Sequence, residues 1–583
     1  MAIQLSPGVS VTEVDLTTVV PSVSTSTGAF VGNFEWGPAS VRVTVDSENT
    51  LASVFGTPNS NTYTSFFTAA SFLAYSNDLR VVRAISTDTR TATANSSASV
   101  QIANEDVYET EYLQGSNANA YGAFASRYAG AAGNAIQVNV YDNASAATFA
   151  NTNITSGGVS RAWSSVVNGA PGTSTYVSTA GGANDEFHVV VTDSTGAITG
   201  TKGSVLEVFP YVSKAIDAVD GNNQTTYWKN VIFTNSNFIY GMDAVDYANT
   251  NATWGDTAAN TTFARTAAVN TTLNLSGGIT AALTDGDINV GYDLFTNSDV
   301  VDISLVLTGG ASVTVQQYVI DNVVTPAGSV TGRSGDSVAF ISPRYSDVVN
   351  QSGGETDNIK NWLETLARSS SYTVTDSGWK YMYDKYNGVY RYVPLNGDIA
   401  GLCAFTDQVR DPWFSPAGFN RGAIKNAVKL SWNPNQTQRD ILYPLGVNPV
   451  VTFPGQGTVL YGDKTLQSKP SAFDRINVRR LFITLEKAIS RAAKFSLFEF
   501  NDDFTRAQFV ALVAPFLRDV QGRRGIYDFR VVCDTTNNTP QVIDNNQFVG
   551  DIYIKPARSI NFIRLNFIAV GTGVQFSEVT GAI

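Results

Sequence analysis

Residues 457–465 come closest in this chain to a loop that could bind a nucleotide. They read GTVLYGDKT and differ by one inserted residue from the pattern G-x-x-x-x-G-K-[ST], whose backbone N–H groups cradle phosphates. The inserted residue is Asp463, and its carboxylate would repel phosphates bound beside Lys464. We therefore expect no nucleotide site in this segment.

A second segment imitates the start of a calcium-binding loop. Residues 285–291 read DGDINVG and place carboxylate or amide groups at alternate positions, as an EF-hand loop does. The glycine falls one place late, however, and Thr296 stands where that loop needs a bidentate glutamate. The pattern therefore predicts a polar β-turn that holds no metal ion.

The remaining reactive side chains have no catalytic or metal-binding spacing. His188 precedes a VVV run and has no Ser or Cys partner recognisable from sequence, so we expect a partly buried strand residue. Cys403 and Cys533 have no CxxC pattern and no neighbouring histidine, which predicts two reduced, buried thiols. No spacing of carboxylates indicates a glycosidase. We expect no enzyme activity, no cofactor and no metal ion.

The composition is that of a large and weakly charged chain. Its 583 residues are 43% hydrophobic and 15% charged, so much of the surface must be neutral, which suits a chain that packs among copies of itself. The net charge of -12 argues against nucleic acid as a partner, because binding it requires clustered Lys and Arg. The N-terminus has no signal-peptide pattern, and no stretch of about eighteen apolar residues occurs. We expect no membrane contact, and synthesis in a reducing cytoplasm.

An α/β unit is predicted in residues 23–93. Residues 27–34 and the VRVTV run that follows them have the patterns of strands. Residues 49–55 and 63–75 have the apolar spacing of helices, and the next strand reads LRVVRAI. This alternation indicates the beginning of an α/β core.

Two β-rich blocks are predicted to interrupt the core as outward-facing insertions. Residues 94–185 contain the strand-like run AIQVNVY, and residues 186–342 contain the hairpin pattern FHVVVTDSTGAITGTKGSVLEVF. Residues 343–570 return to alternating helices and strands, with a helix at 355–367. The predicted fold class is α+β and multidomain, with an α/β core, a C-terminal α/β sheet domain and two mostly β insertion domains.

The two ends of the chain, residues 1–22 and 571–583, are predicted to be linking arms. Residues 4–16 form an extended segment that cannot bury itself alone, so it must pair with a sheet edge in its own domain or in a neighbouring subunit. Glycines precede a similar alternating segment at the C-terminus. We assign inter-subunit strand donation to Val9, Val11, Glu13, Val574, Phe576 and Val579.

Several segments, spread over almost the whole chain, together resemble contractile tail sheath proteins of tailed bacteriophages. They are the arm PGVSVTE, the series FVG, GP, FG and VVRAI, the segments VPLNGDIAGLCAFTD and WFSPAGFNRG, the run LYPLGVNP, and the stretch from PGQG through LYG to the helix that opens with Arg479-Arg480. The segment RYAGAAGNAIQV is also similar, although Ala129 replaces the family's usual proline.

The resemblance implies a structural protein of a virion, and not an enzyme. It implies stacked six-subunit rings around an inner tail tube, linked by arms that add strands to neighbouring C-terminal domains. Baseplate and tail terminator proteins are the further partners, and contraction from a metastable extended state drives the tube through the host envelope. The sheath of a bacterial contractile injection system and a virion-associated hydrolase or adhesin are the alternatives.

A long amphipathic helix is predicted at residues 476–498. One face is apolar and the other is basic. The basic face is either a solvated surface with local ion pairs or a contact surface toward the inner tube or an acidic neighbour. The basic residues are Arg475, Arg479, Lys487, Arg491 and Lys494.

Overall fold

The computed structural model describes residues 23–94, 100–113, 122–242, 253–326, 333 and 335–561. Both predicted linking arms lie outside the described residues, and so do the six residues assigned to strand donation. The chain divides into two compact units. The larger unit comprises Ser22–Pro412 and Pro416–Ala488, and the smaller unit comprises Met1–Pro21, Trp413–Ser415 and Ile489–Ile583.

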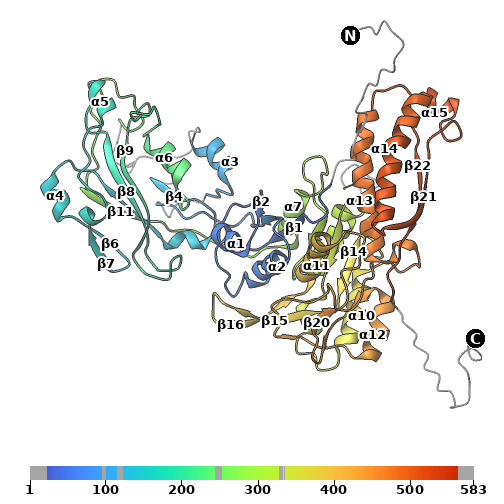
Figure 1. Ribbon diagram of the computed structural model, residues 1–583. Coiled ribbons are helices and arrows are strands. Elements are labelled where there is room, and N and C mark those ends of the chain that lie inside the picture. Colours follow the sequence, from blue (N-terminus) through green and yellow to red (C-terminus); the bar gives the residue numbers. More distant parts are fainter. Residues whose placement is uncertain are drawn as a thin grey trace, which may run out of the picture. The chain divides into compact units, whose positions relative to one another are not determined.

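A seven-stranded sheet forms the centre of the larger unit (Figure 1). Its order is β18-β14-β13-β12-β1-β3-β2, and all neighbouring strands are parallel except β2, which runs antiparallel to β3. The predicted early strands are confirmed as β1, β2 and β3. The strands are β1 Gly28–Gly32, β2 Arg42–Val45, β3 Leu79–Arg83, β12 Leu305–Leu307, β13 Val338–Ile341, β14 Thr373–Asp376 and β18 Val447–Asn448.

Apolar residues cover both faces of this sheet, as a parallel sheet requires. Phe30 of β1 lies in the cluster formed with helices α2 (Tyr63–Leu73) and α11 (Asn396–Val409). Its neighbours Ala29 and Val31 lie in a second cluster with α7 (Asp285–Asp293) and α8 (Val313–Tyr318). The alternation of side chains along β1 therefore assigns consecutive residues to opposite cores.

Helix α7 corrects the prediction of a β-turn at residues 285–291. Thr284 is its N-cap, and its hydroxyl accepts a hydrogen bond from the backbone N–H of Asp287. The Asp287 carboxylate in turn accepts from the Thr284 N–H at 2.8 Å, which completes a capping box. Acidic residues at the start of this segment therefore stabilise a helix N-terminus, where negative charge is favourable.

The β-rich insertion contains one four-stranded sheet with the order β11-β5-β8-β9 (Figure 1). The predicted hairpin is confirmed as the antiparallel pair β8 and β9. Strand β5 comes from the first predicted block and pairs with β8 from the second, so the two blocks share this sheet and do not divide at residue 185. The strands are β5 Ile136–Tyr141, β8 Glu186–Asp193, β9 Ser204–Ser213 and β11 Asn270–Asn274.

The second predicted block also ends earlier than residue 342, because β12 and β13 belong to the central sheet. The insertion begins and ends where Arg90 and Ile279 exchange two backbone hydrogen bonds of 2.9 and 3.0 Å. Its smaller elements are α3 Glu105–Tyr108, β4 Phe124–Ser126, α4 Ala146–Asn151, β6 Asn153–Ser156, β7 Val159–Ala162, α5 Thr175–Thr179, α6 Trp228–Asn235 and β10 Ile239–Gly241.

Arg83, at the end of β3, connects the insertion to the core. Its guanidinium is buried and donates to the carbonyls of Phe34 at 3.0 Å, Gly37 at 2.8 Å and Ala129 at 2.8 Å. Burial lowers the pKa of Arg83 to about 10. The arginine of the VVRAI run thus serves local packing between two parts of the larger unit.

The rest of the larger unit contains short strands and helices around the central sheet. The helix predicted at residues 355–367 is confirmed as α10. The elements are α1 Glu48–Phe55, α9 Tyr345–Val348, α10 Glu355–Leu366, β15 Trp379–Asp384, β16 Val389–Pro394, β17 Lys429–Leu430, α12 Gln436–Leu442, β19 Val450–Phe453 and β20 Gly457–Leu460. Helix α13 (Ile476–Ala493) begins in the larger unit, and its last residues belong to the smaller one.

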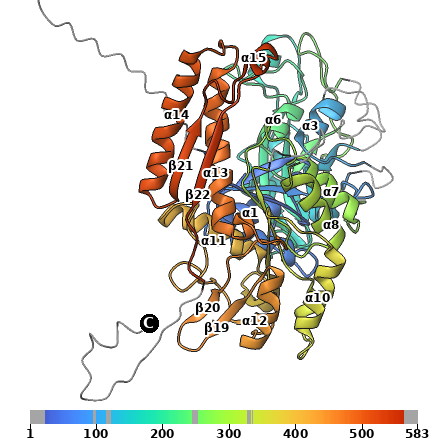
Figure 2. The same ribbon diagram turned by 90° about the vertical axis from the view of Figure 1, so that its right-hand side faces the viewer.

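The smaller unit is built from a long helix and a β-hairpin (Figure 2). Helix α14 contacts strand β21, and its Val513, Leu517 and Val520 are buried. Strands β21 and β22 pair antiparallel, with an irregularity between Ile526 and Asp528. The elements are α14 Asp503–Gly522, β21 Ile526–Val532, α15 Pro540–Asp544 and β22 Asp551–Pro556.

Candidate assembly sites

In the segment that resembles a nucleotide loop, the charged side chains contact residues from outside the segment. Asp463 is 2% exposed, and its carboxylate lies 3.2 Å from the Arg475 guanidinium. The Lys464 ammonium lies over the Tyr443 ring, 4.8 Å from its centre. Neighbouring protein groups therefore hold this segment. In addition, β20 is followed by a loop, whereas a phosphate-binding loop is followed by a helix.

We expect the purified protein to show no binding or hydrolysis of ATP at micromolar protein concentrations. Lys464→Ala should assemble as the unchanged protein does, because the lysine contacts an aromatic ring and no phosphate site. Equilibrium dialysis with labelled ATP tests this, and micromolar binding that Lys464→Ala abolishes would contradict it.

His188 and the two cysteines are buried. His188, expected to be partly buried, is fully buried on β8, where its Nδ1 accepts from the Tyr211 N–H at 3.0 Å and its Nε2 lies 2.8 Å from the Gly169 carbonyl. Burial lowers the pKa of His188. Cys403 and Cys533 are confirmed as free, buried thiols, and burial raises the pKa of Cys403 to about 12. These groups are structural.

The described residues contain no group of three or more His, Cys, Asp or Glu side chains that could hold a metal ion. No helix in the described part of the chain is long and apolar enough to span a bilayer.

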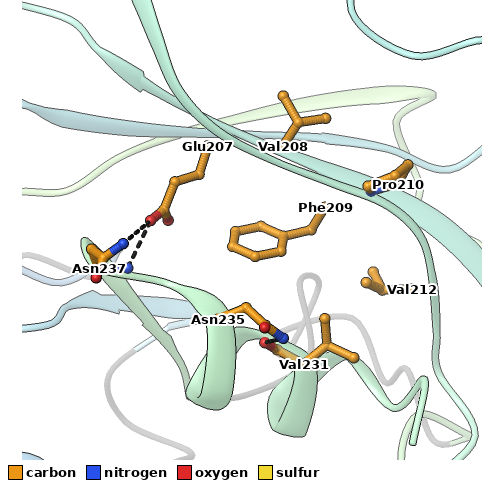
Figure 3. A pocket seen from close by; sticks show the side chains of 8 residues that line it. All are labelled: Glu207, Val208, Phe209, Pro210, Val212, Val231, Asn235 and Asn237. Atoms are coloured by element: carbon orange, nitrogen blue, oxygen red, sulfur yellow. Dashed lines mark hydrogen bonds between the residues drawn. The ribbon is translucent and has the colours of Figure 1, made fainter. Parts of the chain in front are cut away.

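A pocket of about 460 Å³ lies between strand β9 and helix α6 of the insertion (Figure 3). The carboxylate of Glu207 at its edge already accepts hydrogen bonds from the Ser236 hydroxyl at 2.6 Å and the Asn237 N–H at 2.7 Å. The Asn235 amide donates to the Val231 carbonyl of its own helix. Because these polar groups are used internally, the pocket presents no converging set for a ligand.

A buried carboxyl group lies at the end of strand β14. Asp376 accepts from the Ser342 hydroxyl at 2.6 Å and from the Gly378 N–H at 2.9 Å. Burial raises the pKa of Asp376 to about 8, and the nearby Asp398 carboxylate acts in the same direction. Asp398 itself pairs with the buried ammonium of Lys380 at 2.8 Å. Asp376 is therefore neutral over most of the physiological pH range.

This raised pKa predicts a pH-dependent stability. Between pH about 4 and pH about 8 the unfolded chain loses the Asp376 proton while the folded chain keeps it, so the free energy of unfolding falls as pH rises through that window. Asp376→Asn is neutral at every pH, so its melting temperature should fall less between pH 5 and pH 9 and should exceed the wild-type value at pH 9.

Thermal unfolding at pH 5, 7 and 9 tests this, and Asp357→Asn on the exposed side of α10 is the matched control. Equal pH profiles for wild type and Asp376→Asn would contradict the assignment.

Arg479 and Lys487 of α13 are buried and do not belong to a solvated face, which was one of the two expectations for the basic residues. Arg479 donates to the Ser371 hydroxyl at 2.7 Å and lies over the rings of Tyr372 and Phe473. Lys487 is 8% exposed and pairs with Asp302 at 2.8 Å. Burial lowers the pKa of both side chains.

The other basic residues differ in exposure. Arg475 lies just before the helix and bonds to Tyr443 and Asp463. Arg491 is partly exposed, and Lys494 is exposed just after α13. The helix itself ends at Ala493, earlier than the predicted residue 498, because residues 494–496 form a 3-10 turn. Neutralising partners such as Asp302 are distant in sequence, so the pattern alone could not identify them.

Arg480 stands out in the sequence only as part of the dipeptide Arg479-Arg480. In the structure it is 4% exposed and forms a 2.6 Å ion pair with Asp407 of α11. The same carboxylate oxygen accepts from the Thr25 hydroxyl at 2.7 Å. These contacts join three segments that are far apart in the chain.

The β21–β22 hairpin of the smaller unit presents open edges. Within the described residues, neither strand has a second strand partner. Tyr527 of β21 is 70% exposed and Tyr553 of β22 is 59% exposed. The unpaired N–H and C=O groups along the outer edge of each strand, together with these exposed aromatic side chains, suit the hairpin to receive further strands. The alternating sequences IYDFRVV and DIYIKP carry the signal for these strands.

Three family models match consecutive parts of the chain. They are the phage tail sheath C-terminal domain at residues 468–569, the phage tail sheath protein central domain at residues 322–466, and the tail sheath protein Gp18 domain III N-terminal region at residues 25–84. None of the three covers the insertion between residues 90 and 279.

Two curated relatives match over nearly their whole length. The tail sheath protein of Vibrio phage KVP40 is 37% identical over an alignment of 688 positions, gaps included, that covers 99% of this chain and 100% of the relative. The tail sheath protein of Enterobacteria phage T4 is 34% identical over an alignment of 682 positions, gaps included, that covers 99% of each chain.

A solved structure shares the fold at low identity. The sheath tail protein of Listeria innocua matches with a TM-score of 0.50 and 10% identity, over 92% of this chain and 96% of that one. At this identity the match describes the fold alone. The full-length relationship to the two phage proteins is much stronger, and the chain belongs to the phage tail sheath protein family.

Proposed function

We propose that this protein is the repeating subunit of a contractile sheath in the virion, in which stacked six-subunit rings surround an inner tail tube. The observation that carries the proposal is the match of the entire chain to tail sheath proteins, together with an open two-stranded sheet in the smaller unit. Further partners are the baseplate and tail terminator proteins. Assembly takes place in the cytoplasm of the host bacterium, and the protein acts without enzymatic activity, nucleic acid or membrane contact.

Terminal strands link the subunits. Residues 1–22 and 571–583 of one subunit add strands to the open edges of β21 and β22 in its neighbours, with Val9 and Val11 of the first arm and Val574 and Phe576 of the second facing the acceptor. Main-chain hydrogen bonds supply the affinity of such a joint, and alternate side chains supply its specificity. The links persist while the rings move.

The basic residues differ in exposure. Arg475, Arg479 and Lys487 stabilise the larger unit through contacts inside the chain. Arg491 and Lys494 lie in the last helical turn and just after it, and they are the part of the basic set that we assign to contact with the tube or a neighbour.

Contraction needs no chemical fuel. An interface that repeats head to tail generates a helical array, and such an array can be trapped in an extended packing of higher free energy. If repacking releases about 2–5 kcal/mol per subunit, comparable to burying a few side chains, on the order of a hundred coupled subunits release several hundred kcal/mol. Release by the baseplate then drives the tube through the host envelope.

Negative-stain electron microscopy of the purified full-length chain tests the proposal. We expect striated tubes with a central lumen to form without any added protein. Dispersed globular particles at every concentration and ionic strength would contradict it.

A further inference from the structure

Arg480 holds the chain where it leaves the larger unit. Its guanidinium donates to the Thr25 carbonyl at 3.2 Å and to the Cys403 carbonyl at 3.2 Å, and it pairs with Asp407 at 2.6 Å. Thr25 also donates its hydroxyl to Asp407 at 2.7 Å. One residue of the N-terminal segment is therefore bonded to both members of a buried ion pair.

Lys487 reaches the same segment through Ser304. Its ammonium donates to the Ser304 hydroxyl at 2.9 Å, and that hydroxyl donates to the Ser24 carbonyl at 3.0 Å. The N–H groups of Ser304 and Leu305 both donate to the Thr27 carbonyl, at 2.9 and 3.1 Å. Asp302 completes the contact by pairing with the ammonium at 2.8 Å.

Thr27 is bonded to the residue that precedes β3. Thr27 donates its hydroxyl to the Asp78 carboxylate at 2.6 Å, and the Gly28 N–H donates to the Asp78 carbonyl at 2.9 Å. Residues 24–27, which we call the root segment, are thus bonded to α11, to α13, to the start of β12 and to the residue that precedes β3.

Arg480 and Lys487 act from the same side of α13, because seven residues make about two helical turns. Both side chains are buried and charged. Removing a charge from water costs free energy, and only hydrogen bonds and opposite charges around the buried group offset this cost. A hydrophobic contact would hold the root segment less specifically than these directional bonds.

We propose that Arg480 and Lys487 form an anchor that fixes the root segment to helix α13 and the central sheet, so that a load applied to the N-terminal arm is carried by the folded core. This proposal rests on the proposed function in one respect: the load comes from the neighbouring subunit that receives the arm. The contacts of the anchor lie within one subunit and can be measured without assembly. Arg480 and Lys487 are therefore positioning residues for strand donation.

The mechanical role follows from the geometry of the bonds. Without the anchor, a pull on the arm would first act on the bonds of Thr27 to Asp78 and Ser304, and then on the five-residue strand β1, which lies between β3 and β12. With it, the bonds of Thr25 to Arg480 and Asp407, and the bond of Ser24 to Ser304, take up the pull before it reaches Thr27 and β1. Subunits that lack the anchor should therefore unravel from their N-terminal ends under load.

Hydrogen exchange of the full-length protein in its soluble, unassembled form tests the anchor. Thr25→Val keeps the shape of the side chain and removes only the hydroxyl that binds Asp407. Arg480→Met combined with Asp407→Leu removes the ion pair without leaving a lone buried charge. In both variants we expect exchange at the N–H groups of Gly28, Ser304 and Leu305 to be about five-fold faster or more, with unchanged rates in α10.

Thr365→Val is the matched control, because that hydroxyl bonds only within its own helix. The second readout is the concentration of urea that dissociates assembled tubes, which should fall for both anchor variants and stay unchanged for the control. Wild-type exchange rates at all three reporter amides in Thr25→Val would overturn the anchor, even if the double variant failed to fold. Tubes that survive removal of residues 1–20 would instead refute strand donation and leave the exchange result intact, so the two failures are distinguishable.

Discussion

Excising residues 91–278 and joining Arg90 to Ile279 through a short Gly-Ser linker will leave a soluble, cooperatively folded core. The two ends already exchange backbone hydrogen bonds, so the linker spans a short gap. All seven strands of the central sheet and the apolar clusters that they form lie outside the excised range. The loss of the contacts between Arg83 and Ala129 and between Trp36 and Tyr128 should lower the melting temperature by several degrees.

Excising residues 94–183 alone will give the opposite result. That deletion removes β5, which lies between β8 and β11, and it exposes the apolar residues that β5 covers. We expect aggregated protein, because a sheet without its central strand presents unpaired edges. Size-exclusion chromatography and thermal unfolding of both deletions test this contrast. Aggregation of the 91–278 deletion, or a well-folded 94–183 deletion, would contradict the assignment of one shared insertion sheet.

Removing residues 1–20, or residues 571–583, will abolish tube formation and leave a folded, soluble subunit. Each unit keeps its own core, and only the linking strands are lost. Tube formation by each truncated protein is measured by electron microscopy, and its fold is compared with that of the full-length chain by circular dichroism. Tubes of normal length from either truncation would rule out strand donation by that arm.

Point variants test whether the side chains of the first arm that face the acceptor sheet are required, and not only the length of the arm. Val9→Ser combined with Val11→Ser should weaken assembly strongly, because both side chains face the acceptor sheet in the proposed joint. The matched control is Ser10→Ala combined with Thr12→Ala on the other face, which should assemble normally. Equal assembly of the two pairs would contradict the proposed orientation of the arm.

Local periodicity predicted the individual elements of the core well. The apolar spacing of residues 63–75 and the alternation in LRVVRAI correspond to α2 and β3, and the hairpin pattern corresponds to β8 and β9. Composition could not predict the pairing of β5 with β8 across a long connection, because register depends on which strands meet in space. The short acidic run at α7 resembles a polar turn in composition, although Thr284 before it carries the signal of a helix N-cap.

The basic helix face shows what a sequence pattern leaves out. The spacing of Arg479 and Lys487 placed them on one side of a helix, and the structure agrees with that placement. Their surroundings depend on Ser371, Tyr372 and Asp302, which lie far away in the chain. The sequence gives no indication that Arg480 is buried. Its ion-pair partner, Asp407, lies on another helix, and local spacing cannot predict that contact.

Helical reconstruction by cryo-electron microscopy, applied to tubes of the purified chain and to intact virion tails, will show whether terminal strands link the subunits. We expect two additional strands beside β21 and β22 in every subunit, one from the N-terminal arm and one from the C-terminal arm of neighbouring copies. We also expect the compact packing in the purified tubes, because no tube or baseplate templates the extended one. A two-stranded β21–β22 sheet with unoccupied edges in both reconstructions would rule out strand donation by both arms.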